Sequence, residues 1–241
     1  MPNSKKPMNQ TVRPFTTLFM LQSLDGKIST GDSDELDFDK DLPRVPGVME
    51  GLEQYYEIEK TTDIYSLNTG RVMAKIGVNT LTFEPAKIQV TFIIIDNKPH
   101  LNTSGLTYLA KWVKKLIIVT TNPAHPAYQL QESFPNILIQ FFDTSIDFQT
   151  LFADLTSTYK IKKLTIQSGG TLNAHLIRNG LIDRVSVVVA PCLIGGTNTS
   201  SLVGGESLHT KEDLKLIQAL ELEKCTVLEN SFLHLQYNLR S

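Results

Sequence analysis

The stretch LTIQSGGTLNAHLIRNG, from Leu164 to Gly180, decides how the fold of this chain is interpreted. Its first five residues alternate in polarity and include β-branched side chains, which predicts a strand. Leu172, Leu176 and Ile177 then recur at helical spacing, and the final glycine stands where a helix commonly ends. The pair Gly169-Gly170 therefore predicts a tight turn from a strand into a helix.

A turn of this kind is suited to holding a phosphate group. It aims backbone N–H groups and the positive end of a helix dipole at one point. Glycine also lets an anion approach the main chain without meeting a Cβ atom. The alternative is a tight turn that binds nothing, and the diglycine alone does not decide between the two.

The composition excludes several classes of partner. The 241 residues carry a formal net charge of −2 and no basic stripe, which argues against nucleic acid. No apolar run is long enough to span a membrane. The start, MPNSKKPMNQTVRP, lacks the apolar core of a signal peptide, so we expect a cytoplasmic protein. Residues 1–12 are expected to form a disordered tail and residues 13–241 a single domain.

The cysteines and histidines give no sign of a disulfide or a metal site. Cys192 and Cys225 lie on separate apolar segments, which favours buried thiols in a reducing compartment. The five histidines are scattered singly, without the spacing of metal ligands. We therefore expect no metal.

Strand patterns alternate with helical patterns along the chain. The predicted strands are Phe15–Leu21, Asp63–Leu67, Ile88–Ile95, Leu116–Thr120, Ile137–Phe141, Leu164–Gln167, Val185–Ala190 and Phe232–Tyr237. The predicted helices are Val48–Lys60, Gly105–Val113, Phe148–Tyr159, Leu172–Asn179 and Asp213–Leu220. This alternation predicts an α/β fold with a mainly parallel sheet, and the last two strands suggest an antiparallel edge.

In such sheets ligands bind at the carboxyl ends of the strands. Small polar loops follow four of the predicted strands, at residues 22–27, 68–71, 120–123 and 168–171. We expect them to line one crevice. The acidic, proline-containing segment Gly31–Pro46 is predicted to be an exposed loop that can overhang it.

Two segments resemble a known family. SLDGKIS, at Ser23–Ser29, and the stretch from Gly169 to Gly196 are similar to the reductase domain of riboflavin biosynthesis, the pyrimidine reductase family, and the resemblance extends over roughly residues 13–240. It implies a three-layer α/β/α fold like that of dihydrofolate reductase, with a mixed, mainly parallel sheet. It also implies NADPH as hydride donor, a homodimer, and a ribosylamino-pyrimidine phosphate substrate whose ribosyl group is reduced to ribityl. The deaminase half of bifunctional relatives is not recognised, so a stand-alone reductase is expected.

The resemblance also assigns roles to individual residues. It implies that the cofactor pyrophosphate lies on the Gly-rich turn and that the nicotinamide lies over the end of the first strand. The implied cofactor residues are Gly169, Gly170, Thr171, Leu172, Leu21 and Gln22, and the implied substrate residues are Ser33, Gln167 and Leu81. Asn97 either contacts the adenosine ribose or simply forms a turn, and Thr120 either bonds the 2′-phosphate of the cofactor or simply ends its strand.

The chain departs from the family pattern at three places. Arg71 and Lys75 replace cofactor-contacting residues of the family; they either pair with the 2′-phosphate of NADPH or face solvent. The segment beginning at Leu81 lacks the arginine with which the family grips the substrate phosphate. Gln167 stands where the family usually has a glutamate.

The residues leave the proton donor and the function class open. Asp25 is the nearest obvious carboxylate in the sequence, but Asp-Gly after a strand is a strong turn signal, and an aspartate there often caps its own backbone. The alternatives to the riboflavin-pathway reductase are a reductase of the same fold that acts on another pterin-like or pyrimidine-like substrate, and a non-catalytic nucleotide-binding homodimer. Arg71, Lys75 and Gln167 pointing into the crevice favour an enzyme; a crevice filled by Phe83 or Met73 favours the binding protein.

Overall fold

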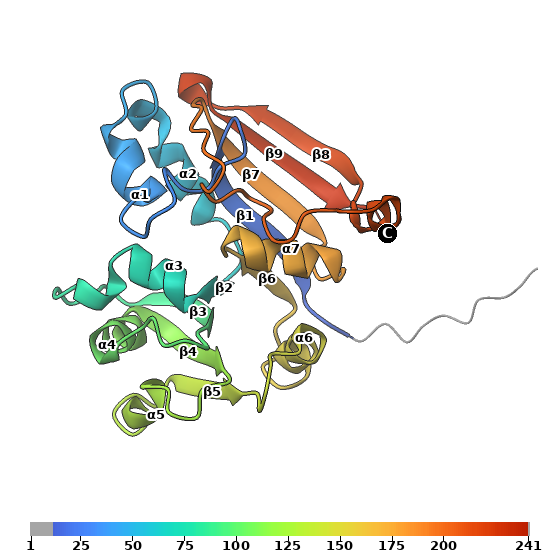
Figure 1. Ribbon diagram of the computed structural model, residues 1–241. Helices are drawn as coiled ribbons and strands as arrows, with labels where there is room; N and C mark the ends of the chain where they lie inside the picture. The colour runs from blue at the N-terminus through green and yellow to red at the C-terminus, as the bar shows by residue number, and fades with distance from the viewer. Residues whose placement is uncertain (1–11, 241) are drawn as a thin grey trace, which may run out of the picture.

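A nine-stranded sheet forms the centre of the molecule (Figure 1). The computed structural model describes residues 12–240, so the predicted tail lies outside the described residues except for Val12. The strands lie in the order β5-β4-β3-β2-β6-β1-β7-β9-β8. Their bounds are β1 Phe15–Ser23, β2 Tyr65–Thr69, β3 Ile88–Ile95, β4 Val113–Thr120, β5 Ile137–Phe141, β6 Lys163–Ile166, β7 Arg184–Ala190, β8 Leu220–Val227 and β9 Leu233–Leu239.

The sheet is mixed and mainly parallel, as predicted. Strands β1 to β7 pair in parallel, and β1 lies between β6 and β7. Strand β9 is antiparallel to both β7 and β8. The antiparallel end therefore contains one strand more than the sequence patterns predicted.

Helices cover both faces of the sheet. Their bounds are α1 Phe38–Asp41, α2 Glu53–Glu59, α3 Gly70–Lys75, α4 Thr103–Trp112, α5 Ala127–Leu130, α6 Phe148–Ser157 and α7 Gly170–Arg178. Short 3₁₀ turns occupy Leu42–Arg44, Met49–Gly51, Val78–Thr80, Lys211–Leu216 and Glu229–Ser231. Figure 1 shows α6 and α7 on one face and α3 and α4 on the other.

Alternate residues of the central strands divide the core between the two faces. Leu18 of β1 packs with Phe152 of α6 and Leu176 of α7, while its neighbour Phe19 packs on the opposite face with Tyr55 of α2. This follows from the period of two along a strand. Because both faces of β1 are buried, packing on both sides fixes the position of the strand and of its carboxyl end.

One predicted helix is wrong, and another begins later than predicted. The segment predicted as a helix from Asp213 to Leu220 forms only a 3₁₀ turn and then enters β8. The residues of β8, LELEKCTV, alternate apolar and charged side chains at the start, which is typical of an exposed edge strand. The helix predicted from Val48 is interrupted, and Gly51 there lies so close to Phe232 that a Cβ would come within 2.6 Å of the ring.

The acidic segment Gly31–Pro46 is more ordered than the predicted loop. It contains α1, and Phe38 and Leu42 are buried against the core beside β1. Cys225 is exposed, so the prediction of a buried thiol is wrong there, and Cys192 is partly buried. Among residues 12–240 no helix has the length and apolarity to cross a membrane.

Candidate functional site

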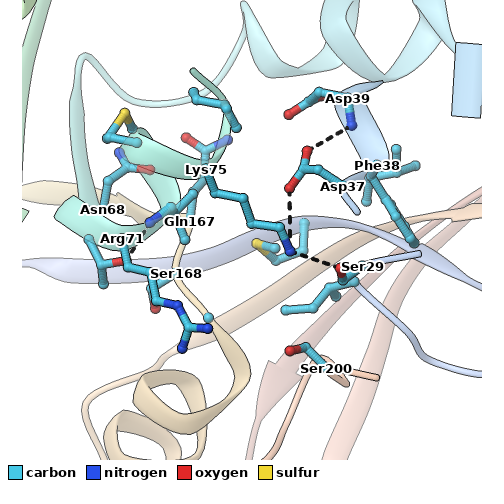
Figure 2. A pocket seen from close by; sticks show the side chains of 18 of the residues that line it. Ser29, Asp37, Phe38, Asp39, Asn68, Arg71, Lys75, Gln167, Ser168 and Ser200 are labelled. Atoms are coloured by element: carbon cyan, nitrogen blue, oxygen red, sulfur yellow. Dashed lines mark hydrogen bonds and ion pairs between the residues drawn. The ribbon is translucent and has the colours of Figure 1, made fainter. Parts of the chain in front are cut away.

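A cleft of about 740 Å³ opens at the carboxyl ends of the central strands (Figure 2). The ends of β1 and β2, the turn after β6, helix α3 and the acidic segment around α1 form its walls. Phe83 is exposed outside the cleft, and Met73, although it lines the wall, is buried in the core. The cleft is therefore open rather than filled by these two side chains.

The diglycine turn lies on one wall of this cleft. Gly169 is the N-cap of α7, and no side chain caps the helix there. The first helical hydrogen bond runs from the Asn173 N–H to the Gly169 carbonyl. The N–H groups of Gly170, Thr171 and Leu172 therefore have no acceptor within residues 12–240. A Cβ at Gly169 would meet no atom within 4 Å, which leaves room for an anion.

At Gly170 a glycine is required because a neighbouring segment of main chain passes very close to it. Its carbonyl accepts a hydrogen bond from the Gly204 N–H (2.9 Å), and a Cβ at Gly170 would come within 2.2 Å of the Ser201 carbonyl oxygen. Asn173 donates a further bond from its side-chain amide to the Leu202 carbonyl (2.8 Å). The segment 201–204 thus fixes the start of α7 by direct contact with its main chain.

Two cations of α3 reach the cleft. Lys75 donates from Nζ to Ser29 Oγ (2.9 Å), its Nζ lies 3.8 Å from Asp37, and its side chain is only 15% exposed (Figure 2). Arg71 lies at the rim, is 63% exposed and pairs with Asp34 at 2.9 Å. Hydrogen bonding to Arg71 lowers the pKa of Asp34, although partial burial opposes it. Both cations are within the lining of the cleft, where phosphate groups can meet them.

A row of hydrogen bonds crosses the floor of the cleft. Asn68 donates from Nδ2 to Ser66 Oγ (2.9 Å), and the Ser66 hydroxyl donates to Gln167 Oε1 (3.0 Å). Gln167 in turn donates from Nε2 to Oε1 of Glu59. Burial raises the pKa of Glu59, since its surroundings disfavour the charge more than the Gln167 bond stabilises it.

Aromatic rings line the same space. Tyr55 and Tyr56 of α2, Phe38, Phe92 and Trp112 all contribute to the cleft wall. The Tyr56 hydroxyl donates to Asp39 Oδ1 (2.7 Å). The combination of flat apolar surfaces and acceptor groups is suited to a planar, nitrogen-rich ring.

Residues 14–233 match the family described as the RibD C-terminal domain. The chain belongs to that family. The 2,5-diamino-6-ribosylamino-4(3H)-pyrimidinone 5′-phosphate reductase of Methanothermobacter thermautotrophicus is 25% identical over 84% of this chain and 89% of that protein. The riboflavin biosynthesis protein RibD of Actinobacillus pleuropneumoniae is 23% identical over 83% of this chain, which spans only 51% of it.

Solved structures of the family share the fold. RibD of Acinetobacter baumannii matches with a TM-score of 0.67 and 17% identity over 96% of this chain and 59% of that one. The riboflavin biosynthesis reductase Rib7 of Saccharomyces cerevisiae matches with a TM-score of 0.60 and 17% identity over 97% and 93%. Together with the mixed sheet, these matches confirm the predicted α/β fold of the dihydrofolate-reductase-like type. The match of residues 14–233 to the family model, in turn, confirms the family named from the sequence.

The cleft brings together most of the residues that this family resemblance assigned. Arg71, Lys75 and Gln167, which were to distinguish an enzyme from a binding protein, all line it. The predicted residues in the lining are Leu21, Ser33, Arg71, Lys75, Gln167, Gly169, Gly170, Thr171 and Leu172. Their contacts with cofactor or substrate stay predictions.

Asp25 lies outside the cleft and holds a turn. Its carboxylate accepts hydrogen bonds from the Ser23 hydroxyl (2.5 Å), the Gly195 N–H (2.6 Å) and the Ile194 N–H (3.2 Å). The Ser23 bond, followed by the Gly195 bond, lowers the pKa of Asp25 to about 2. A carboxylate that stays ionised at neutral pH cannot donate a proton, so the structure favours the turn role over catalysis.

Four other predicted residues also lie outside the cleft lining. Thr120 is fully buried, and its hydroxyl donates to the Asp96 carbonyl (2.9 Å). Asn97 accepts a bond from the Thr121 N–H (3.0 Å) and so stabilises its own loop. Gln22 is half-buried at the end of β1, and Leu81 packs against the core beside α4. The hydroxyl of Thr120 is thus already in use, and Leu81 serves packing.

Sequence reasoning missed the residues that supply the polar floor and the acidic wall. These are Ser29, Asp37, Asp39 and Glu59, with Tyr55 and Tyr56 from the same helix as Glu59. Asn68, by contrast, belongs to the loop 68–71 that was expected to line the crevice, and it does so. Glu59 carried no signal, because a glutamate near a helix end is ordinarily solvated.

Proposed function

We propose that this chain is an NADPH-dependent reductase of riboflavin biosynthesis. Its substrate is an amino-ribosylamino-pyrimidine 5′-phosphate, with either a diaminopyrimidinone or a pyrimidinedione ring, and the reaction converts the ribosyl group to ribityl. Membership of the RibD C-terminal domain family and the names of the relatives support this proposal. The observation that carries it is the set of free N–H groups at the start of α7, which opens onto a cleft lined with aromatic and polar side chains.

The glycine turn fits a dinucleotide. The space over Gly169 and the N–H groups of Gly170, Thr171 and Leu172 are suited to a diphosphate. Arg71 and Lys75 are the cations in the cleft lining of the described chain, and they would favour NADPH over NADH by meeting its 2′-phosphate. When bound, the cofactor supplies the hydride; the protein positions the ribosyl carbon and the pyrimidine beside it.

Binding and turnover test this proposal separately. NADPH should raise the melting temperature and change its own fluorescence on binding, with a weaker effect from NADH. Adding the ribosylamino-pyrimidine phosphate should then lower the absorbance of NADPH as the cofactor is oxidised, and mass spectrometry should detect the ribityl product. No response to either cofactor would rule out a nicotinamide-dependent enzyme.

A reductase that acts on a different pyrimidine or pterin is the second candidate. The observation in its favour is that the segment from Leu81 to Glu84 offers no cation, and Glu84 itself pairs with Lys111 at 2.8 Å outside the cleft. A substrate without a phosphate would need no such cation. Binding of NADPH without reduction of either phosphorylated pyrimidine would favour this candidate.

We also infer a cytoplasmic homodimer. Strand β8 is the edge of the sheet and is almost entirely exposed, and its apolar side chains Leu220 and Leu222 face solvent. An edge with exposed apolar residues invites pairing with a second copy. Light scattering should give a mass near twice 26.9 kDa, and a monomer would contradict the dimer. The two free thiols are compatible with a reducing compartment.

A further inference from the structure

The row of hydrogen bonds on the cleft floor has a direction. The Asn68 amide, the Ser66 hydroxyl and the Gln167 amide each donate toward the next residue. Because the single proton of Ser66 goes to Gln167 Oε1, the Gln167 amide must present its NH₂ group to Glu59. The row therefore ends on a carboxylate, which can only accept hydrogen bonds.

The Glu59 carboxylate has spare capacity. Its Oε1 accepts the Gln167 bond, whereas Oε2 has no hydrogen-bond partner among residues 12–240. No lysine or arginine of the described chain pairs with it. It is half-buried and lines the cleft. Partial burial of a carboxylate costs free energy when neither a cation nor enough hydrogen-bond donors satisfy it. A ligand that brings donors to Glu59 would offset that cost.

The residues around Glu59 indicate the kind of donor. Tyr56 comes from the same helix and is the more exposed of its two aromatic rings, and Gln167 comes two residues before the glycine turn. A ring bound here would therefore lie next to the cofactor turn with one edge toward Glu59. Each carboxylate oxygen can accept two hydrogen bonds, so Oε1 can take a second donor beside Gln167 while Oε2 takes another, and an edge with two neighbouring N–H donors would match this carboxylate.

We propose that Glu59 selects the non-deaminated pyrimidine, the 2,5-diamino-4(3H)-pyrimidinone, over the deaminated pyrimidinedione. The inference rests on the proposed function. In the diamino ring, N3–H and the 2-amino group are adjacent donors that a carboxylate accepts together. In the dione, a carbonyl oxygen replaces the amino group, so two acceptors would face each other and the carboxylate would lose one bond and gain repulsion.

The test is the ratio of kcat/KM for the two phosphorylated pyrimidines. The wild-type protein should favour the diamino substrate by about 10- to 100-fold, the effect expected for a hydrogen bond to a charged group. Glu59→Gln keeps the shape of the side chain but offers one donor and one acceptor, which matches the N3–H and C2 carbonyl of the dione. The variant should therefore bring the ratio to about one or reverse it.

Glu57→Gln is the matched control. It removes the same charge from the same helix, but Glu57 lies outside the cleft and pairs with Lys60 at 2.5 Å. Its ratio should equal that of the wild-type protein, and the melting temperatures of both variants report whether they fold.

The outcomes separate this inference from the proposed function. If both substrates are reduced but Glu59→Gln leaves their ratio unchanged, or the wild-type protein favours the dione, the role of Glu59 is overturned and the reductase stands. If neither substrate is reduced while NADPH binds, the proposed function fails and the inference fails with it.

Discussion

Gly169→Asp should abolish tight cofactor binding while leaving the fold intact. Gly169 has φ −72° and ψ 156°, values that any residue adopts, and a Cβ there meets nothing within 4 Å. Aspartate is also a better N-cap than glycine, so α7 should gain a few tenths of a kcal/mol. The same substitution at Gly170 is a poor probe, because a Cβ would press on the Ser201 carbonyl.

The loss of affinity has two sources. The new carboxylate would itself accept the N–H groups of the first turn, which the diphosphate needs. It would also lie about 5 Å from a bound phosphate, where two unit charges repel by about 3 kcal/mol at an effective dielectric of about 20. That energy corresponds to an increase in Kd of roughly 100-fold.

The assay is an NADPH titration followed by fluorescence, beside a thermal melt without ligand. We expect Gly169→Ala to bind NADPH nearly as well as the wild-type protein, since it adds no charge. Gly170→Ala should instead lower the melting temperature, because overpacking against a fixed main chain costs about 1–3 kcal/mol. A Kd for Gly169→Asp within about twofold of the wild-type value would show that the diphosphate does not lie on this turn.

Three further predictions test separate parts of the structure. Arg71→Ala should raise the Kd for NADPH about 3- to 10-fold and leave that for NADH unchanged; an equal loss for both would exclude a 2′-phosphate contact. Asp25 has a folded pKa of about 2, below its ordinary value, so the stability it contributes is present above about pH 4 and is lost as the pH falls toward 2. Asp25→Asn should therefore lower the melting temperature at pH 7 and change it little at pH 2, and an equal loss at both would contradict the ionised role. Phe152→Ala, at a fully buried core position, should cost about 3–5 kcal/mol in chemical denaturation, and a cost below about 1 kcal/mol would mean that α6 is not held by this packing.

The sequence predicted the elements whose patterns are long and regular. Ile88–Ile95 coincides with β3, and the strand, turn and helix around Gly169 form as expected, because buried parallel strands and glycine turns leave strong local signals. Strand β8 was missed although its side chains alternate, because its charged residues resemble those of a surface helix. Its conformation depends on pairing with β9, which no local pattern reports.

The residues of the candidate site also fall into two groups: those with a strong local signal in the sequence, and those whose position depends on contacts between distant segments. Gly169 to Leu172 could be found because a turn carries its own chemistry in adjacent residues. Glu59 could not, since its place beside Gln167 depends on how α2 packs over β1, a contact between distant segments. Asp25 was misleading for the same reason, because its partners Ile194 and Gly195 lie far along the chain and engage the carboxylate in a turn.

The close passage of the main chain at Gly170 and Gly204 links two positions that are remote in the sequence. A Cβ at residue 204 would lie 3.3 Å from the carbonyl carbon of Gly170 and 3.5 Å from the nitrogen of Thr171, which is tighter than side chains normally pack, so the start of α7 would have to shift. A random mutagenesis screen for variants that lose cofactor binding should therefore recover substitutions of Gly204, although this residue is not in the cleft lining. Among homologues, a residue larger than glycine at position 170 or 204 should occur only where the segment at the other position has a different conformation.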